Sequence, residues 1–306
     1  MTEKLTKVGN KLAQLREPFI APVTDIVGRV NEIRGILAAW MAGVDILPLS
    51  PLLLGDPGLG KNRIVYECAR ICSKDLYIFQ GHEDVGAEDL VCAVRFSDDP
   101  NKKMDYIVSE LVTAMLRGGI CFIDEIAKIR PRALAPLASL LDERRYLDSI
   151  VLGERIYAHP GFRFVAASNT TDLEAALLPD FIRSRMRPVI TVRYPDRDEI
   201  DRILRSRYSI LRKNGKKLLD CFWGLWKDSH GDKPPSPRDF IDTFAFALSL
   251  ANSEKTKIKK PFILEHPGSL CTIRKEHIEK AFEQRFYIYG KGKHVSESHK
   301  FAIPRQ

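Results

Sequence analysis

The sequence predicts an α/β protein of three layers, in which helices cover both faces of a five-stranded, mainly parallel β-sheet. Five short and nearly continuous apolar runs follow one another along the first two thirds of the chain, which is typical of strands buried on both faces. Amphipathic segments with helical spacing lie between these runs, as expected for crossover helices. From residue 196 onward the pattern is helical, which predicts a small α-helical lid subdomain after the sheet.

The five predicted strands are rich in β-branched, aromatic and leucine residues and cover residues 52–54, 76–79, 120–123, 164–167 and 189–192. Helices are predicted between them over residues 62–71, 104–116 and 132–141. The lid is predicted to hold four helices separated by glycine-containing turns, over residues 202–211, 217–226, 237–251 and 273–287.

We therefore expect four parts along the chain. An N-terminal helix over residues 1–17 precedes the α/β core over 18–195, the helical lid covers 196–290, and a basic flexible tail covers 291–306. The tail is expected to be loosely ordered because it is rich in Lys, His and Ser.

The composition is that of a globular protein, with 44% hydrophobic and 29% charged residues among 306. Its six cysteines include no CxxC pair, so we interpret them as small buried hydrophobic residues in a reducing compartment. No apolar leader segment follows Met1, and the most apolar stretch, residues 36–54, is interrupted by Asp45, Pro48 and Pro51. These features predict a cytoplasmic protein that does not enter a membrane.

The net charge of +8 is unevenly distributed. Residues 1–195 carry 25 Lys and Arg against 25 Asp and Glu, whereas residues 196–306 carry 23 against 15. Such an excess attracts nucleic acid or an acidic partner. No basic stripe interleaved with aromatic residues accompanies the charge, so a solvated lid and tail explain it more simply.

The most informative segment is a glycine-rich turn after the first predicted strand, at the spacing G-x-x-x-x-G-K. Glycines let the backbone curl until its N–H groups point at phosphate oxygens, and the following helix adds its positive N-terminal end. Lys61 is expected to reach the outer phosphates as a point charge. The predicted phosphate-binding residues are Gly55, Asp56, Pro57, Gly58, Leu59, Gly60, Lys61 and Asn62.

Asn62 stands where such a loop usually carries a Ser or Thr whose hydroxyl ligates Mg²⁺. An amide oxygen also ligates Mg²⁺, but it sits one atom further from the backbone, so the octahedral geometry of the ion requires an adjustment. We keep Asn62 as a predicted metal ligand, and its presence argues against rapid hydrolysis.

Two carboxylates end the third predicted strand, and an amide follows the fourth. Asp124 and Glu125 come directly after residues 120–123, and Asn169 follows residues 164–167 by way of Ser168. In open α/β sheets, ligands bind at the carboxyl ends of the strands. We expect Asp124 to hold Mg²⁺, Glu125 to orient a water that attacks a γ-phosphate, and Asn169 to bridge that water and the phosphate.

This ordered set, followed by an arginine pair and a Ser-Pro-Arg segment, resembles the AAA+ ATPases, and within them the MoxR, midasin and dynein-related branch. Residues 118–198 carry most of the resemblance, including a hairpin-like stretch over 146–159 where members of this branch carry a β-hairpin insertion. The resemblance covers residues 25–250 and implies a P-loop NTPase core with a small helical lid that binds ATP and Mg²⁺.

The resemblance also implies site residues outside the phosphate loop. Arg185 matches the arginine finger that family members insert into the neighbouring subunit's site. Arg183 lies two residues earlier and would point to another face of a helix, and the family pattern of Arg followed by an apolar residue favours Arg185. The segment that matches the adenine-flanking part of the family is Ile26, Val27, Gly28 and Arg29, and the binding residues predicted from it are Ile26, Val27 and Gly28.

Arg238 matches the sensor-2 position of the family. Ser236 is a good helix N-cap and Pro237 fits the first helical position, so Arg238 falls in the first turn. There the positive helix end and the guanidinium group are expected to face phosphates together.

The function implied by the resemblance is an ATP-hydrolysing ring, expected to be a hexamer, that remodels a macromolecular partner. In this branch the partner is frequently a protein with a von Willebrand A domain, which here must be a separate polypeptide. Two alternatives stay open: an ATP-gated assembly scaffold that hardly hydrolyses ATP, which Asn62 favours, and a nucleic-acid remodeller or defence-system motor subunit that uses the basic C-terminal third.

Overall fold

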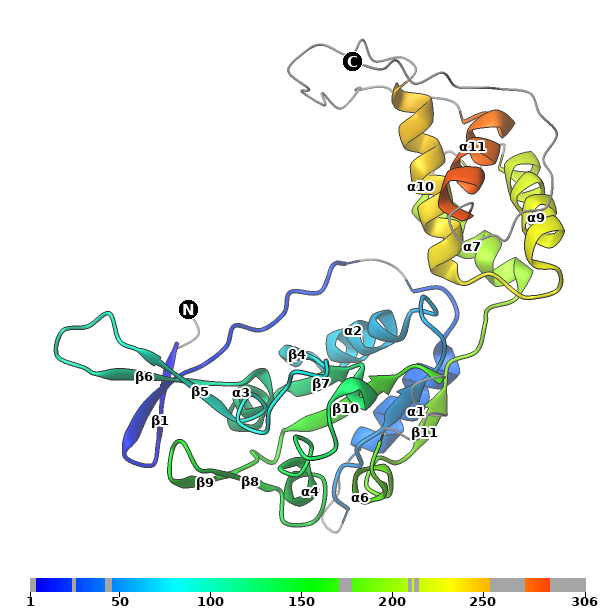
Figure 1. Ribbon diagram of the computed structural model, residues 1–306. Helices are drawn as coiled ribbons and strands as arrows, with labels where there is room; N and C mark the ends of the chain where they lie inside the picture. Colours follow the sequence, from blue (N-terminus) through cyan, green and yellow to red (C-terminus); the bar gives the residue numbers. More distant parts are fainter. Residues whose placement is uncertain are drawn as a thin grey trace. The chain divides into compact units, whose positions relative to one another are not determined.

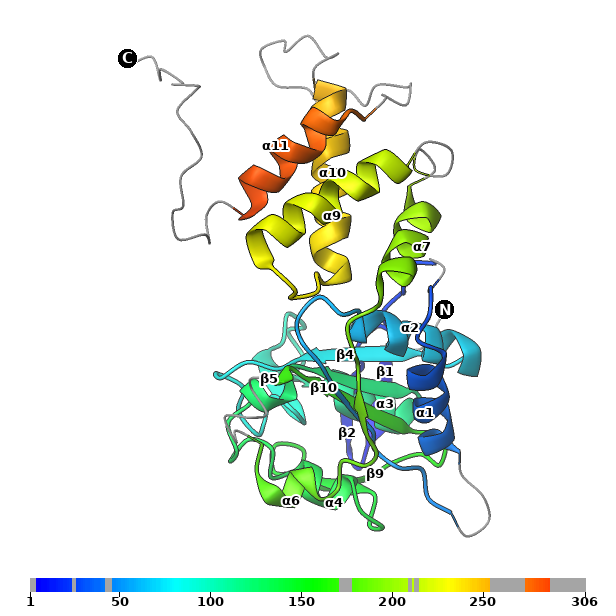
Figure 2. The ribbon, with the colours of Figure 1, turned by 90° about the vertical axis from the view of Figure 1, so that its right-hand side faces the viewer.

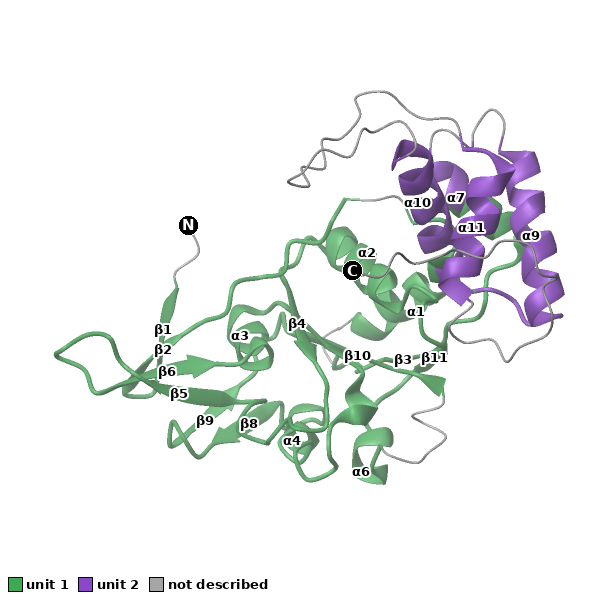
Figure 3. Cartoon of the chain, turned by 45° about the horizontal axis from the view of Figure 1, so that its top comes forward, with its two compact units in different colours: residues 1–203, 236–238 green, residues 204–235, 239–306 purple. Residues whose placement is uncertain are grey.

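The computed structural model describes residues 4–23, 26–41, 46–170, 178–208, 211, 215–253 and 273–286. The chain divides into two compact units (Figure 3): unit 1 is residues 1–203 with 236–238, and unit 2 is residues 204–235 with 239–306. The first change of unit therefore falls within α7 (Arg197–Arg207), later than the boundary predicted after residue 195. The predicted tail over 291–306 lies outside the described residues.

Unit 1 is built on a five-stranded sheet in which every strand runs parallel to its neighbours (Figure 1). The strand order across the sheet is β11-β3-β10-β7-β4. All five predicted strands are confirmed, and the α/β class with them. Their bounds are β3 (Leu52–Leu54), β4 (Leu76–Gln80), β7 (Ile120–Asp124), β10 (Arg163–Ser168) and β11 (Val189–Thr191).

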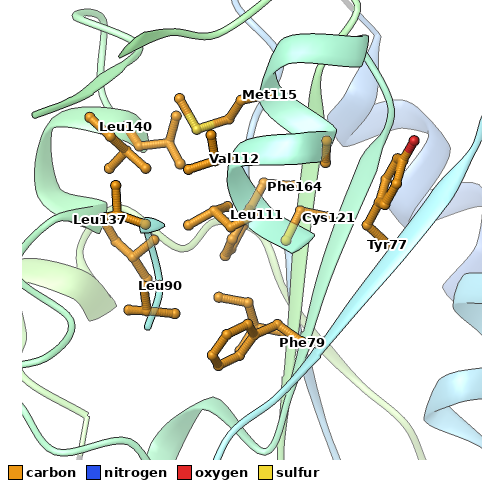
Figure 4. Close-up of a cluster of buried hydrophobic side chains, with 14 of the residues drawn as sticks. Tyr77, Phe79, Leu90, Leu111, Val112, Met115, Cys121, Leu137, Leu140 and Phe164 are labelled. Atoms are coloured by element: carbon orange, nitrogen blue, oxygen red, sulfur yellow. The ribbon is translucent and has the colours of Figure 1, made fainter. Parts of the chain in front are cut away.

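Helices cover both faces of this sheet, because successive side chains of the buried strands point to opposite faces. Ile120 and Phe122 of β7 pack on the side of α1 (Val30–Trp40) and α2 (Lys61–Cys72), which lie side by side (Figure 2). Cys121 and Ile123 face the other way. They join a larger core with residues of α3 (Glu110–Arg117), including Leu111, Val112 and Met115, and with Phe164 of β10 (Figure 4).

The N-terminal residues form a β-hairpin, so the helix predicted over residues 1–17 is wrong. β1 (Leu5–Val8) and β2 (Lys11–Gln14) pair antiparallel, and Gly9 between them has a φ of +56°. A tight hairpin turn needs such left-handed backbone, which glycine adopts without strain. The hairpin joins a four-stranded sheet of order β1-β2-β6-β5.

The helix predicted over residues 104–116 is only partly right. Its first residues form β6 (Met104–Val108), which pairs antiparallel with β5 (Cys92–Phe96). The helical part, α3, begins after Ser109, whose side chain accepts a hydrogen bond from the Val112 backbone N–H at 3.1 Å. This N-cap fixes where the helix starts, and the apolar residues before it extend a strand instead.

Between β7 and β10, the chain forms η1 (Ile126–Lys128), a short helix α4 (Leu137–Leu140) and a hairpin. The helix predicted over residues 132–141 shrinks to α4, and residues 131–136 are turns. Pro131 and Pro136 explain this difference, since proline lacks a backbone donor and disfavours the helical region for the preceding residue. The predicted hairpin is confirmed as β8 (Tyr146–Ser149) and β9 (Glu154–Tyr157).

Unit 2 contains α9 (Lys216–His230), α11 (Lys275–Phe286) and all of α10 (Pro237–Ser253) from residue 239 onward. The helices meet in an aromatic cluster centred on Phe222, which is fully buried and stacks on Phe240 with ring centroids 3.8 Å apart. The four helices predicted for the lid are present with shifted ends. α7 starts earlier than predicted because the Asp196 carboxylate caps it by accepting the Glu199 N–H at 2.7 Å.

The five described cysteines carry unpaired thiols, and three of them are buried. Burial raises the pKa of the Cys68 thiol to about 12, which makes it a small hydrophobic side chain rather than a nucleophile. Cys271 lies outside the described residues. None of the helices in the described part of the chain is both long and apolar enough to cross a membrane.

The core on the α3 side of the sheet gives a prediction about stability. Phe164 is 1% exposed within the α3-side core, so Phe164→Ala removes a ring that its neighbours cannot replace and should lower the free energy of unfolding by about 3–5 kcal/mol. Phe96, which is 84% exposed, is the matched control, and Phe96→Ala should change it by less than about 0.5 kcal/mol. Urea denaturation measures both, and equal effects would contradict the assignment of this core.

Candidate nucleotide-binding site

The predicted site residues of the strands converge because β3, β10 and β7 are neighbours in the sheet. Ala166 pairs with Leu52 of β3 on one side and with Ile123 of β7 on the other, so the three strands end at the same edge. The segments that leave this edge carry the glycine-rich loop, Asn169 and the Asp124–Glu125 pair. The sheet therefore brings together, as predicted, groups that are far apart in the sequence.

The loop between β3 and α2 curls around the side chain of Lys61. Gly58 and Gly60 have φ angles of +85° and +89°, a backbone region that other residues rarely adopt. The Lys61 ammonium group is buried and donates to the carbonyl oxygen of Gly55 at 2.6 Å and to that of Asp56 at 3.2 Å. It also donates to Oδ1 of Asn169 at 3.0 Å, which joins the loop to the end of β10.

Burial lowers the pKa of the Lys61 ammonium group, and the carboxylates of Asp124, Asp56 and Glu125 oppose this shift. The charge of Arg238 adds to the lowering. Lys61 is thus a desolvated cation within reach of three carboxylates and a second cation. Additional negative charge, such as that of a phosphate group, would raise the pKa of the ammonium group again.

Asp124 and Asn62, the two predicted metal ligands, are in direct contact. Asn62 lies at the start of α2 and its Nδ2 donates to Oδ2 of Asp124 at 2.9 Å. The other carboxylate oxygen, Oδ1, accepts the backbone N–H of Glu125 at 3.0 Å. One turn further along α2, burial raises the pKa of the Tyr66 phenol, and the neighbouring Asn62 side chain opposes this shift.

These side chains fit a Mg²⁺ ion that is bound together with nucleotide phosphates. Both carry oxygen donors, and rotation of the Asn62 amide would turn its oxygen toward the position that its nitrogen now occupies. Nowhere in the described segments do three or more His, Cys, Asp or Glu side chains gather as a metal site. The ion would therefore need phosphate and water oxygens to complete its shell, as is usual for Mg²⁺.

Glu125 is positioned at the same edge, but its carboxylate is already paired. Oε2 accepts from Nε2 of Gln80 at 3.0 Å and from Nζ of Lys128 at 2.9 Å. The Glu125 backbone has a φ of +55°, a strained value for a residue with a side chain. Sequence reasoning missed Gln80 and Lys128, although both follow from position: Gln80 ends β4, the neighbour of β7, and Lys128 lies three residues after Glu125.

Ser236 and Arg238 belong to unit 1 and lie against the glycine-rich loop. A Cβ atom on Gly58 would come within 2.6 Å of Ser236 Oγ and 3.0 Å of Arg238 Cβ, so glycine is required here for space as well as for backbone angle. α10 begins at Pro237, as predicted. Arg238 is thus brought close to the loop, where its positive charge contributes to the lowered pKa of Lys61.

The arginine pair contacts Asp142 and residues of the helix α6 (Asp180–Arg183). This helix ends before Arg185, so the two arginines do not lie on one helix as predicted. Arg183 is exposed and paired with Asp180. Arg185 is less exposed; its Nη1 donates to the carbonyl oxygen of Phe181 at 2.8 Å, and Nη2 lies 3.5 Å from Oδ2 of Asp142.

The predicted adenine-flanking segment, Ile26, Val27 and Gly28, precedes α1, and Ile26 packs against the core on the α1 side. Arg29 ends the segment that matches the family. Its Nη2 donates to the carbonyl oxygen of Leu59 at 3.2 Å and Nη1 to that of Arg193 at 2.7 Å. The hydroxyl of Tyr194 likewise donates to Asp56 at 2.9 Å. These two side chains tie the loop to its surroundings, and neither contact was predicted from the sequence.

Comparisons with known proteins agree with this geometry. Residues 50–186 match the family model described as the AAA domain, dynein-related subfamily. The denitrification regulatory protein NirQ of Pseudomonas aeruginosa is 33% identical over 139 residues, which are 45% of this chain and 50% of that protein. Protein NorQ of Paracoccus denitrificans is 34% identical over 128 residues, 42% of this chain and 46% of that protein. The chain thus spans about half the length of the curated relatives that it matches.

Among solved structures, the RuvB Holliday junction branch migration motor of Thermotoga maritima is similar in fold. It superposes with a TM-score of 0.54 at 18% identity, covering 84% of this chain and 70% of that one. This likeness supports the fold of the P-loop core. It does not identify what the chain acts on. The family match identifies residues 50–186 as an AAA domain of the dynein-related subfamily, as the resemblance implied, and the likeness in fold agrees with it.

Proposed function

We propose that this chain binds ATP with Mg²⁺, hydrolyses it, and assembles into a ring, a hexamer, that remodels a separate macromolecular partner. The observation that carries this proposal is the convergence of Lys61, Asp124, Glu125 and Asn169 at one sheet edge, beside a glycine-rich loop. The assignment of a protein partner, and of a von Willebrand A domain protein in particular, rests on the resemblance to this branch.

Each residue of the site would have a separate role in hydrolysis. The loop N–H groups, Lys61 and Arg238 would hold the phosphates, and Asn62 and Asp124 would hold Mg²⁺, which neutralises developing charge on the phosphate oxygens. Glu125 would release Gln80 and Lys128 and orient a water for attack on the γ-phosphorus, while the bond from that phosphorus to ADP breaks. Asn169 would bridge the water and the phosphate.

A scaffold that binds ATP but hardly hydrolyses it is the second candidate. It is favoured by Asn62 in place of a hydroxyl and by the paired state of Glu125. Nucleic-acid remodelling is a third, favoured by the charge of residues 196–306 alone. Binding of DNA or RNA that weakens steeply with salt would distinguish it from the other two.

The Glu125 assignment predicts that binding and hydrolysis separate in one variant. Glu125→Gln keeps the size of the side chain but loses the carboxylate, so it should slow ATP hydrolysis by about 10²–10⁴-fold and leave nucleotide affinity unchanged. Phosphate release and binding of a fluorescent ADP measure the two quantities. Glu17→Gln, at a 78% exposed side chain, is the matched control and should behave as the parent. Parental hydrolysis by Glu125→Gln would refute the assignment.

The Arg185 assignment predicts that this residue acts between subunits. Arginine fingers contribute about 10³–10⁵-fold to kcat, so Arg185→Ala should be nearly inactive alone. Lys61→Ala should be inactive because it loses nucleotide binding. Mixing the two variants should restore part of the ATPase activity, since some interfaces then pair an intact loop with an intact finger.

The mixing experiment has its own control. Arg183→Ala mixed with Lys61→Ala should show no gain beyond the activity of Arg183→Ala itself, because the family pattern of Arg followed by an apolar residue assigns the finger to Arg185. Mixtures that co-assemble without recovery would show that Arg185 does not act between subunits. Complementation by Arg183→Ala instead would transfer the finger to Arg183.

Asn62 separates the ATPase from the scaffold. If the site already accommodates the amide, Asn62→Thr should change ATP turnover by less than tenfold, or about 1.4 kcal/mol. We expect this modest change, because Asp124, Glu125 and Asn169 are all in place. Steady-state turnover over a range of Mg²⁺ concentrations measures it. A parent without detectable ATPase activity that Asn62→Thr rescues strongly would favour the scaffold.

A further inference from the structure

Partly buried cations gather at the edge of the sheet where the strands begin. Ile120 of β7 pairs with Leu76 of β4 on one side and with Arg163 of β10 on the other, so the three strands start at the same level. Lys74 lies two residues before β4, and Arg163 is the first residue of β10. At the rise of a parallel strand, this edge lies about 20 Å from Asn169 at the other end of β10.

Two guanidinium groups meet at the turn that leads into β10. Arg163 donates from Nη1 to the carbonyl oxygen of Phe162 at 2.9 Å, and Arg145 donates from Nη2 to the same oxygen at 3.2 Å. Arg163 is fixed further by its Nε, which donates to the carbonyl oxygen of Trp40 at 2.7 Å. The guanidinium group of Arg145 lies over the Phe162 ring, 5.5 Å from its centroid. Both cations are therefore held in place beside one oxygen atom.

Lys74 reaches the same turn. Its Nζ donates to the carbonyl oxygen of Gly118 at 2.8 Å. A Cβ atom on Gly161 would come within 3.1 Å of this Nζ, so the ammonium group lies against the backbone of the turn, where a side chain at position 161 would crowd it. We call Lys74, Arg145 and Arg163 the basic cluster.

No carboxylate balances the basic cluster within the part of the chain that the structure describes. The hydrogen bonds of its three side chains to described residues all go to backbone carbonyl oxygens. None of the three forms an ion pair with a described residue, and this includes Asp75, which follows Lys74 directly. Carbonyl contacts explain where the cations lie, but they leave three like charges close together without an opposite one.

The cations of the basic cluster act on one another. Burial lowers the pKa of Lys74 and that of Arg145, and the charge of Arg163 adds to both shifts. Cys72 opposes the shift of Lys74, but burial raises the pKa of this thiol, so it stays neutral near pH 7 and supplies no negative charge. A bound anion would offset the repulsion among the three cations.

The basic cluster also has donors left for a ligand. A guanidinium group carries five N–H donors and an ammonium group carries three. Nη2 of Arg163 and both Nε and Nη1 of Arg145 meet no acceptor among the described residues, and none of these nitrogen atoms is among the buried polar atoms that lack a partner. They are therefore open to solvent.

We propose that Lys74, Arg145 and Arg163 form a binding site for a phosphate group, separate from the nucleotide site and at the opposite edge of the sheet. Two planar guanidinium groups and one ammonium group supply the donors that the oxygens of a phosphate accept from. A phosphate carries up to two negative charges near pH 7, so it balances the basic cluster better than a single carboxylate does. The inference goes beyond the proposed function and does not depend on it.

The test is titration of inorganic phosphate onto the full chain, followed by calorimetry at an ionic strength kept constant with NaCl. The chain carries Lys61→Ala, so that the glycine-rich loop does not contribute to binding. Arg145→Gln should then raise the Kd for phosphate by about 10- to 100-fold, the effect of losing one charge-assisted contact. Arg144→Gln is the matched control and should leave this Kd unchanged, because the guanidinium group of Arg144 is paired with Asp142.

A second background covers the case in which Lys61→Ala does not fold. The same titration on the parent chain saturated with ADP and Mg²⁺ leaves the loop occupied and the basic cluster open. O-phosphoserine in place of inorganic phosphate identifies the source of the phosphate group, because tighter binding than that of the free ion indicates a phosphomonoester.

Equal Kd values for Arg145→Gln and Arg144→Gln would overturn the inference. So would the absence of phosphate binding by a chain that circular dichroism shows to be folded. Neither result concerns the ATPase activity of the parent, so the proposed function would stand or fall by its own experiments.

Discussion

An ammonium group with little access to water needs acceptors around it, and the site is arranged to supply them to Lys61. Two acceptors are carbonyl oxygens of its own loop and the third is the side chain of Asn169. The cation thereby fixes the curl of the loop and its distance from β10. The carboxylates of Asp124, Asp56 and Glu125 offset the desolvation of this charge.

The acidic groups of the site are balanced in the same way. Asp124 accepts from Asn62 and from the Glu125 backbone, and Glu125 accepts from Gln80 and Lys128. Every group assigned to hydrolysis at this edge is thus engaged with another part of unit 1. A ligand entering the site has to exchange these contacts for its own, so binding and rearrangement of side chains are coupled.

The features that could be predicted from the sequence were those determined by a residue pattern within one short segment. Short, nearly continuous apolar runs predicted the five strands, and the shared edge of parallel strands then brought Asp124 and Asn169 together with Lys61. The N-terminal hairpin was missed although Gly9 marks its turn, because the short strands around it carry little apolar content. The Tyr194–Asp56 and Arg29–Leu59 contacts join segments far apart in the chain. Such pairings depend on the packed structure, which no local pattern contains.

The alternation along β7 has a consequence for how this chain can vary. Ile120 and Phe122 fill one core, Cys121 and Ile123 fill the other, and the carboxylates follow directly at the end of the strand. Exchanging one apolar residue for another there alters only the fit of one layer. Inserting or deleting a single residue would instead swap the two faces and turn Asp124 away from Asn62. The length of this strand is therefore far more constrained than the identity of its apolar residues.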